Sequence, residues 1–156
     1  MLAHCGFHRC VVHSDNRITR VIPNVKEDGL AQPALGFLLE RLRGERRDSL
    51  RDVAKLADID HAYLYRLETG SKESPSEEVL SKVIKALKAE EREAGMLRYL
   101  AKHPETDPGL VEHVLTDKTV TLDEFSSAAG AAFRGNARPD YPKLIERVRR
   151  MLSMEE

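Results

Sequence analysis

The side chains with the clearest chemical use lie in the segment His61–Thr69. If this segment is a helix that buries Leu64 and Leu67, its opposite face is exposed, and side chains on such a face can meet base edges in the major groove of DNA. The exposed set would be His61, Ala62, Tyr63, Tyr65 and Arg66. Imidazole, phenol and guanidinium groups all form hydrogen bonds, so duplex DNA is a suitable partner for this surface.

A second group of reactive side chains lies near the start of the chain. Cys5, His8, Cys10 and His13 have the spacing C-x-x-H-x-C-x-x-H, and both residue types are zinc ligands. The single residue between His8 and Cys10 is tight for a closed zinc site, and no second half of such a site follows. We therefore predict no metal and no cofactor, and we expect a disordered arm here.

Sequence signatures of catalysis are missing. The chain contains no G-x-x-x-x-G-K-[ST], G-x-S-x-G, H-E-x-x-H or G-x-G-x-x-G motif. Paired carboxylates such as Glu77-Glu78 and Glu90-Glu91 fit helix starts or solvated faces. His103 and His113 belong to different segments and are expected at the surface. The sequence therefore predicts a protein that is not an enzyme.

The charges of the chain nearly cancel, with 25 Lys and Arg against 26 Asp and Glu. Their distribution is uneven, because residues 41–55 hold six cations and three anions, whereas residues 89–156 hold ten cations and thirteen anions. The local charges are therefore +3 and −3. The basic stretch could face phosphates. Alternatively, it belongs to a mixed, solvated helical surface.

Three features of the sequence predict a cytoplasmic protein. Its only cysteines, Cys5 and Cys10, cannot build a disulfide framework. No apolar run approaches the roughly 18 residues that a membrane-spanning helix needs. The first twelve residues lack the basic segment and continuous apolar stretch of a secretory signal.

Residues 33–88 show the apolar periodicity of helices. On the first helix, the spacing i, i+3, i+4, i+7 is filled by Leu35, Leu38, Leu39 and Leu42. Later helices follow residues whose side chains can accept hydrogen bonds from free backbone amides, namely Ser49, Asp60 and Ser76. The expected helices are 34–46, a short one from Ser49 to about Ala57, 61–69, and one that follows Ser76 and ends near Leu87.

The second and third of these helices are joined by Asp58, Ile59 and Asp60. Asp58 is expected in the left-handed conformation that often follows a helix, where Gly is usual and Asp is tolerated. Ile59 is expected to point inward. Two short helices joined by such a turn form the helix-turn-helix geometry. Its second helix presents N-terminal residues to the major groove.

The segment Ser49–Gly70, S-L-R-D-V-A-K-L-A-D-I-D-H-A-Y-L-Y-R-L-E-T-G, resembles the lambda-repressor-like regulators of the xenobiotic-response-element family. Their pattern is approximately S-x-x-x-L-A-x-x-A-G-V-S-x-x-x-[IL]-S-x-x-E-x-G, followed by P-S and an amphipathic helix. Pro75-Ser76 and residues 79–87 match that ending. Asp58 stands where the family usually has Gly, and Tyr65 where it often has Ser. The resemblance implies a five-helix DNA-binding domain.

The resemblance also implies roles for individual residues. Base contacts would come from His61, Ala62 and Arg66, and Arg66 could pair bidentately with guanine. Phosphate contacts, which fix the register of a protein on DNA, would come from Ser49, Thr69, Ser71 and Lys72. Arg43 and Glu68 match a structural pair that ties the first helix to the recognition helix. The alternative for His61 and Arg66 is that both are ordinary solvated side chains.

Residues 89–156 are also expected to be helical, in segments 90–102, 110–115, a helix after the T-x-x-E capping box of Thr121 and Glu124, and 141–154. Members of the family usually dimerise on half-sites about one DNA turn apart, and this half is the natural place for that contact. Four large and small residues of this half could form the dimer contact: Phe125, Ala129, Ala132 and Phe133. Alternatively, they form a local core without a partner.

A shorter resemblance is carried by Phe133-Arg-Gly135, Arg138-Pro139 and Tyr141, followed by a basic helix that ends in Arg149-Arg-Met-Leu152. These residues look like the C-terminal domain of DNA-damage-response and mobile-element repressors. A partner zinc metallopeptidase inactivates those repressors by cutting within that domain. The likeness implies that cleavage removes dimerisation and releases the operator.

The sequence therefore predicts an all-α protein with an arm over 1–32, a helix-turn-helix domain over 33–88 and a helical dimerisation or regulatory domain over 89–156. The predicted function is that of a dimeric, sequence-specific repressor. One alternative is an antitoxin that binds a toxin through its C-terminal half and regulates its own operon. Another is a protein-interaction module that does not bind DNA. Residues 110–152 are expected to fold alone, which favours the repressor, because antitoxin segments often fold only on their toxin.

Overall fold

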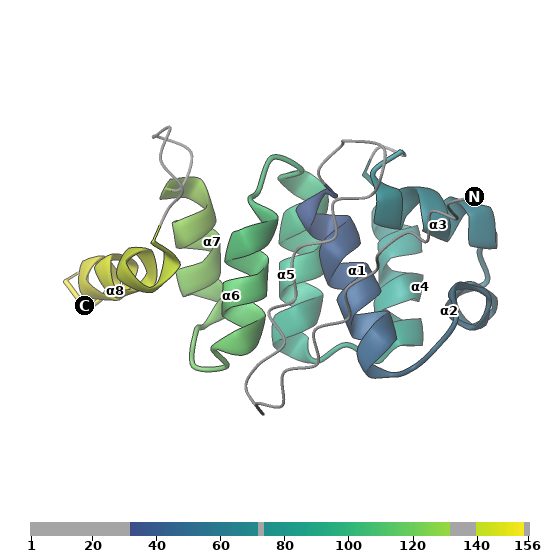
Figure 1. Ribbon diagram of the computed structural model, residues 1–156, viewed down its shortest axis with the longest axis horizontal. Helices are drawn as coiled ribbons and strands as arrows, with labels where there is room; N and C mark the ends of the chain where they lie inside the picture. The colour runs from purple at the N-terminus through teal and green to yellow at the C-terminus, as the bar shows by residue number, and fades with distance from the viewer. Residues whose placement is uncertain (1–31, 72–73, 132–139, 155–156) are drawn as a thin grey trace, which may run out of the picture.

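The computed structural model describes residues 32–71, 74–131 and 140–154, and in these ranges it contains helices and no strand (Figure 1). The helices are α1 (Ala34–Glu45), α2 (Leu50–Ala57), α3 (His61–Thr69), α4 (Glu77–Leu87), α5 (Glu91–Lys102), α6 (Pro108–Thr116), α7 (Leu122–Ala131) and α8 (Tyr141–Leu152). The predicted all-α fold is confirmed. No helix within the described ranges is long and apolar enough to cross a membrane.

The helices follow one another along the long axis of the molecule, with α2, α3 and α4 at one end and α8 at the other (Figure 1). α1 is central, because it packs against α3, α5 and α6. α7 packs against both α5 and α8. A single apolar core extends from Leu35 in α1 to Val148 in α8, and burial of its side chains is the main favourable contribution to folding. This core is continuous across residue 88, where the sequence predicts a domain boundary.

Local sequence sets the ends of α2 and α3. The Ser49 hydroxyl accepts a hydrogen bond from the Asp52 amide at 3.2 Å, and the Asp52 carboxylate accepts one from the Ser49 amide at 3.1 Å. These two bonds form a capping box at the start of α2. Asp58 ends α2 with a left-handed φ of 52°. Asp60 then caps α3, because its Oδ1 accepts backbone amides at 2.9 and 3.1 Å.

A long-range contact from α5 and a local capping box position α6 and α7. The Arg92 guanidinium in α5 donates to the Val114 carbonyl at 3.3 Å and to the Val120 carbonyl at 2.9 Å. It therefore satisfies carbonyl groups near and beyond the end of α6, where a helix leaves its last carbonyls without backbone partners. Thr121 and Glu124 form the predicted capping box at α7, with distances of 3.0 and 3.2 Å.

Two side-chain contacts hold α8. The Tyr141 hydroxyl donates to Oδ2 of Asp107, the N-cap residue of α6, at 2.5 Å. The Arg149 guanidinium donates to both carboxylate oxygens of Glu124 in α7, at 2.9 and 3.3 Å. The first contact needs space at Gly109, because a Cβ there would lie 2.5 Å from the Tyr141 hydroxyl oxygen.

The prediction that Phe125 and Ala129 offer a surface to a second copy is wrong. Phe125 is 0% exposed and Ala129 is 2% exposed. α7 directs both side chains into the chain's own core, where the Phe125 ring meets the edge of Tyr99 at a centroid distance of 5.4 Å. The alternative interpretation, a local core, is correct for these two residues.

The two histidines expected at the surface are only partly exposed, because each one stacks on a tyrosine. The ring centroids of His103 and Tyr99 are 4.3 Å apart. Those of His113 and Tyr141 are 6.1 Å apart. His103 also lies 3.3 Å from the Glu105 carboxylate. The two ring contacts join residues four and 28 positions apart, so they are not visible from residue type alone.

Several predictions concern residues outside the described ranges. They are the arm over 1–31 with Cys5, His8, Cys10 and His13, the phosphate contact Lys72, and the segment that contains Ala132, Phe133-Arg-Gly135 and Arg138-Pro139. Gln32, which the sequence places in the arm, is described. Its amide donates to Glu40 at 2.7 Å and to the Glu68 carbonyl at 3.0 Å, so residue 32 belongs to the folded domain.

Candidate nucleic-acid interface

α3 has a buried face and an exposed face. Leu64 and Leu67 are 1% and 3% exposed. The opposite face is exposed and carries His61, Ala62, Tyr65 and Arg66, with Tyr63 partly buried beside them. Tyr65 is 52% exposed, which makes it one of few large apolar side chains at the described surface. The structure therefore gathers the predicted base-contacting residues on one accessible surface.

A buried ion pair holds the inner face of α3 against α1. The Arg43 guanidinium donates through Nε and Nη2 to the two carboxylate oxygens of Glu68, at 2.9 and 3.0 Å. Its Nη1 donates to the Asp48 carbonyl at 3.3 Å. The hydrogen bond to Glu68, opposed by partial burial, raises the pKa of Arg43. Glu68 is only 3% exposed, and a buried charge of this kind is tolerated when it is paired and hydrogen-bonded.

Close backbone contact reinforces that ion pair. A Cβ built on Gly36 would lie 2.1 Å from the Glu68 carbonyl oxygen, so only glycine lets α1 approach α3 this closely. The Gln32 amide donates to the same carbonyl. Sequence reasoning missed both residues. A glycine inside a regular helical pattern was the available signal for Gly36, because such a residue usually has a packing reason.

The cations near the turn between α1 and α2 divide into paired and unpaired groups. Arg46 lies 3.0 Å from Asp48 and Arg41 lies 2.9 Å from Glu45, so two of the positive charges are locally neutralised. Arg43 is paired with Glu68, and the other three cations of this basic stretch are exposed and form no ion pair within the described residues: Arg47, Arg51 and Lys55. These three are therefore available to phosphates, a role that the resemblance did not assign to them.

The Ser49 hydroxyl is already engaged in a hydrogen bond, although its predicted phosphate contact requires that it donate to a phosphate. Its hydroxyl donates to the Asp52 carboxylate at 2.6 Å. The Ser49 hydroxyl first, and its amide second, hold the pKa of Asp52 below the usual range, so this carboxylate stays charged. A phosphate at the start of α2 would meet that negative charge. Ser49 can donate to it only if its hydroxyl turns away from Asp52.

Two further predicted phosphate contacts lie together at the end of α3. The Thr69 hydroxyl donates to the Tyr65 carbonyl at 3.0 Å, and it lies 3.1 Å from the Ser71 hydroxyl. Gly70 separates the two residues with a φ of 77°. This left-handed turn favours glycine, and a Cβ at position 70 would also lie 2.8 Å from the Pro33 ring. Ser71 is exposed, so its hydroxyl is accessible just after the end of α3.

These elements make a helix-turn-helix: α2 and α3 meet at the bend formed by residues 58–60, and the outer face of α3 is open. A family model described as a helix-turn-helix domain matches residues 34–113, which are 80 of the 156 residues. The chain therefore belongs to this helix-turn-helix family, whose members are DNA-binding regulators. No curated protein matches the chain.

The family match extends beyond residue 88. It includes all of α5 and the first part of α6. In the structure α5 packs against α1 and α4, and α6 packs against α1. Both helices therefore support α1, which carries Arg43 and Gly36. Through α1 they help to position α3.

Proposed function

We propose that this chain is a sequence-specific transcription regulator that places α3 in the major groove of its operator. The observation that supports this most strongly is the contrast between the two faces of α3. Its inner face is fixed by the Arg43–Glu68 pair, while Arg66 and His61 are exposed on its outer face. A firmly packed helix with exposed donors is what direct contact with base edges requires.

The proposal assigns a chemical role to each residue of the outer face. Arg66 pairs bidentately with guanine, a contact that discriminates against the wrong base by roughly 1–3 kcal/mol. His61 donates to guanine N7 or O6, or to a phosphate. Ala62 contacts a thymine methyl group. Tyr65 lies on the exposed face of α3, and Tyr63, which is partly buried against the core, borders it.

Phosphate contacts complete the proposed interface. Thr69, Ser71 and Lys72 contact the backbone at the end of α3, and Ser49 contacts it at the start of α2. The unpaired cations Arg47, Arg51 and Lys55 add positive charge near Ser49. Each phosphate neutralised should steepen the dependence of log affinity on log salt by about 0.9.

The finer part of the proposal is that the regulator represses transcription as a homodimer. A single recognition helix contacts few base pairs, so paired half-sites about 34 Å apart would supply the remaining specificity. Phe125 and Ala129 are buried and cannot serve as the contact. In the described part of the C-terminal half, the large exposed apolar side chains are Met151 and Met154, at 61% and 85% exposure. They support a contact through the end of α8.

The proposal is tested by selecting bound duplexes from a random library with the purified chain. Affinity for the winning site and for a scrambled duplex is then measured between about 50 and 200 mM salt. We expect one enriched motif, bound at least about 10³-fold more tightly than the scrambled duplex. A selected pool without a motif would contradict the proposed function.

The dimer has a separate test. We expect the double substitution Met151→Ser and Met154→Ser to shift the chain toward the monomer in sedimentation experiments, with no change in its helix content. An unchanged mass would contradict a contact through α8. The matched control is Ser127→Ala, at an exposed position of α7.

A further inference from the structure

A cleft of about 340 Å³ lies between the ends of α2 and α4. Part of its lining is apolar and comes from the buried Ala57 and Ala86 and from Leu56, which is 65% exposed. The remaining lining residues are charged: Asp58, Lys82, Lys85 and Lys88. We propose that this cleft binds an acidic segment of a partner protein, which packs an apolar side chain on Leu56 and pairs carboxylates with the lysines.

Leu56 gives the cleft an accessible apolar surface. Among the described residues, it is the only leucine with a largely exposed side chain. The neighbouring lysines add their aliphatic stems, because a lysine side chain can lie along an apolar surface and keep only its ammonium group in water. Exposed apolar surface with a polar rim is a feature of protein–protein contact sites. An apolar side chain of a partner can therefore pack here.

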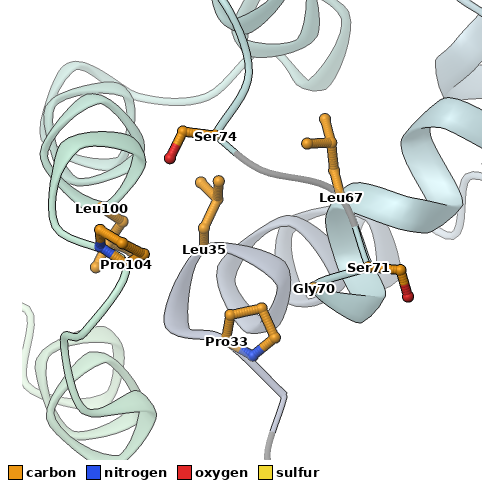
Figure 2. A pocket seen from close by; sticks show the side chains of 8 residues that line it. All are labelled: Pro33, Leu35, Leu67, Gly70, Ser71, Ser74, Leu100 and Pro104. Carbon is orange, nitrogen blue, oxygen red and sulfur yellow. The ribbon is translucent and has the colours of Figure 1, made fainter.

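A depression between α1, α3 and α5 has the opposite character (Figure 2). Its three leucines are each at most 7% exposed: Leu35, Leu67 and Leu100. The described residues that line it carry no charge. It therefore offers a partner neither apolar contact area nor an ion pair, whereas the cleft between α2 and α4 offers both.

The lysines of the cleft are not needed to complete the helix ends. A lysine near the end of a helix often binds the last carbonyl groups. In α2, the Ile59 amide donates to the Ala54 carbonyl at 3.0 Å. In α4, the Ala89 amide donates to the Ile84 carbonyl at 3.2 Å. Because backbone amides satisfy these carbonyls, the ammonium groups remain available to a partner.

The acidic groups near the cleft act mainly on one of its three lysines. The Lys82 ammonium lies 3.0 Å from the Glu78 carboxylate. The hydrogen bond to Glu78 first, and the charge of Asp58 more weakly, raise the pKa of Lys82. Lys85 and Lys88 are exposed and form no ion pair within the described part of the chain. These two lysines are therefore the ones that can pair with carboxylates of a partner.

The mixed lining favours an acidic protein segment over nucleic acid. Contacts to a phosphate backbone come from charged and polar groups, so they would leave Leu56 uncovered. The Asp58 carboxylate in the same lining would repel a phosphate. No residue of α3 lines the cleft, so this contact is separate from the proposed DNA surface and does not rest on it.

Three peptides with blocked ends test the site: EELEE, EESEE and KKLKK. They combine acid with an apolar side chain, acid alone, and base with the same apolar side chain. Binding to the full chain is followed by the NMR signals of the Leu56 methyl groups and of the Lys85 and Lys88 amides. We expect EELEE to bind roughly 3- to 10-fold more tightly than EESEE, because it partly buries one leucine. KKLKK should cause no shift.

Two variants separate the apolar contact from the ionic one. Leu56→Ser should remove the advantage of EELEE over EESEE. Lys85→Gln combined with Lys88→Gln should weaken both acidic peptides by roughly 3- to 10-fold, the worth of two exposed ion pairs.

The matched control replaces two exposed lysines outside the cleft, Lys102→Gln with Lys118→Gln, and should leave binding unchanged. Circular dichroism verifies that each variant is folded.

The proposal is overturned if EELEE shifts none of the three residues, if KKLKK binds as tightly as EELEE, or if neither variant weakens binding. Signals that move on dilution without peptide would show that a second copy covers the cleft. Displacement of EELEE by a scrambled duplex, with shifts at the same lysines, would assign the cleft to nucleic acid. Either result also overturns the proposal.

Discussion

Two arginine–glutamate pairs connect distant helices of this molecule, and they differ in burial. Arg43 and Glu68 join α1 to α3, with side chains 19% and 4% exposed. Arg149 and Glu124 join α8 to α7, with side chains 40% and 14% exposed. Both pairs are bidentate, and in both the partners are 25 positions apart. The same type of bidentate ion pair therefore occurs at a buried position and at a more exposed one.

The difference in depth indicates where the fold is held most firmly. Breaking a buried pair leaves an uncompensated charge away from water, whereas breaking a more exposed pair returns both groups to solvent. The buried pair lies directly behind the proposed DNA surface. The proposed recognition helix α3 should therefore be more rigidly held than α8, and four predictions test this comparison directly or through its consequences.

The largest expected effect is that of Glu68→Ala. It leaves the Arg43 guanidinium without its carboxylate, and it should lower the free energy of unfolding by about 3 kcal/mol, measured by urea denaturation. Glu124→Ala should cause a smaller loss. Equal losses for the two variants would contradict the comparison. Glu78→Ala, at an exposed residue of α4, serves as the control.

Next in size is a pair of glycine substitutions within α1. Gly36→Ala should lower the free energy of unfolding by about 2 kcal/mol, because its Cβ would collide with the Glu68 carbonyl. Gly44→Ala should raise it by about 0.5–1 kcal/mol, because nothing lies within 4 Å of the new methyl group and alanine favours a helix. Thermal denaturation of both variants checks the sign. A stabilising Gly36→Ala would show that α1 and α3 are not in tight contact.

The outer face of α3 should respond differently from its inner face. Arg66→Ala should leave stability unchanged and remove roughly 1–3 kcal/mol of preference for the selected site over a scrambled duplex. Lys72→Ala should weaken binding to both duplexes and reduce the salt slope by about 1. Fluorescence anisotropy measures both effects, with Arg147→Ala in α8 as the control. Equal loss on both duplexes for Arg66→Ala would contradict base contact.

The smallest effect is a pH dependence at the more exposed pair. Burial raises the pKa of Glu124, but hydrogen bonds from Arg149 and from the Thr121 amide outweigh it, so the pKa lies below its ordinary value of 4.5. The stabilisation by this carboxylate is therefore complete above about pH 4.5 and is lost as the pH falls through the lowered pKa. Glu124→Gln should lose less stability than the wild type between neutral pH and pH 3. Parallel losses would contradict the assignment.

The helix ends were largely predictable from the sequence, because capping is a local interaction. Ser49, Asp60, and Thr121 with Glu124 all cap the helices that they were expected to cap. The left-handed turn at Asp58 was predictable for the same reason. Residues within three positions of one another carry this information, so no knowledge of the tertiary fold is needed.

Contacts between distant segments were mostly not predictable. The approach of Gly36 to the Glu68 carbonyl depends on how α1 crosses α3. The burial of Phe125 depends on which side of α7 faces α5, and periodicity alone allowed either a local core or a partner surface. The Arg43–Glu68 pair was predicted only because the family resemblance implied it.

The most direct test of the central claim is to map the selected duplex onto the chain by NMR titration. We expect the largest chemical-shift changes at His61, Ala62, Tyr65 and Arg66, whereas Met151 near the distant end of α8 and Met154 just after it should not respond to the duplex. Changes confined to α8, with the signals of α3 unmoved, would contradict the assignment of α3 as the recognition helix.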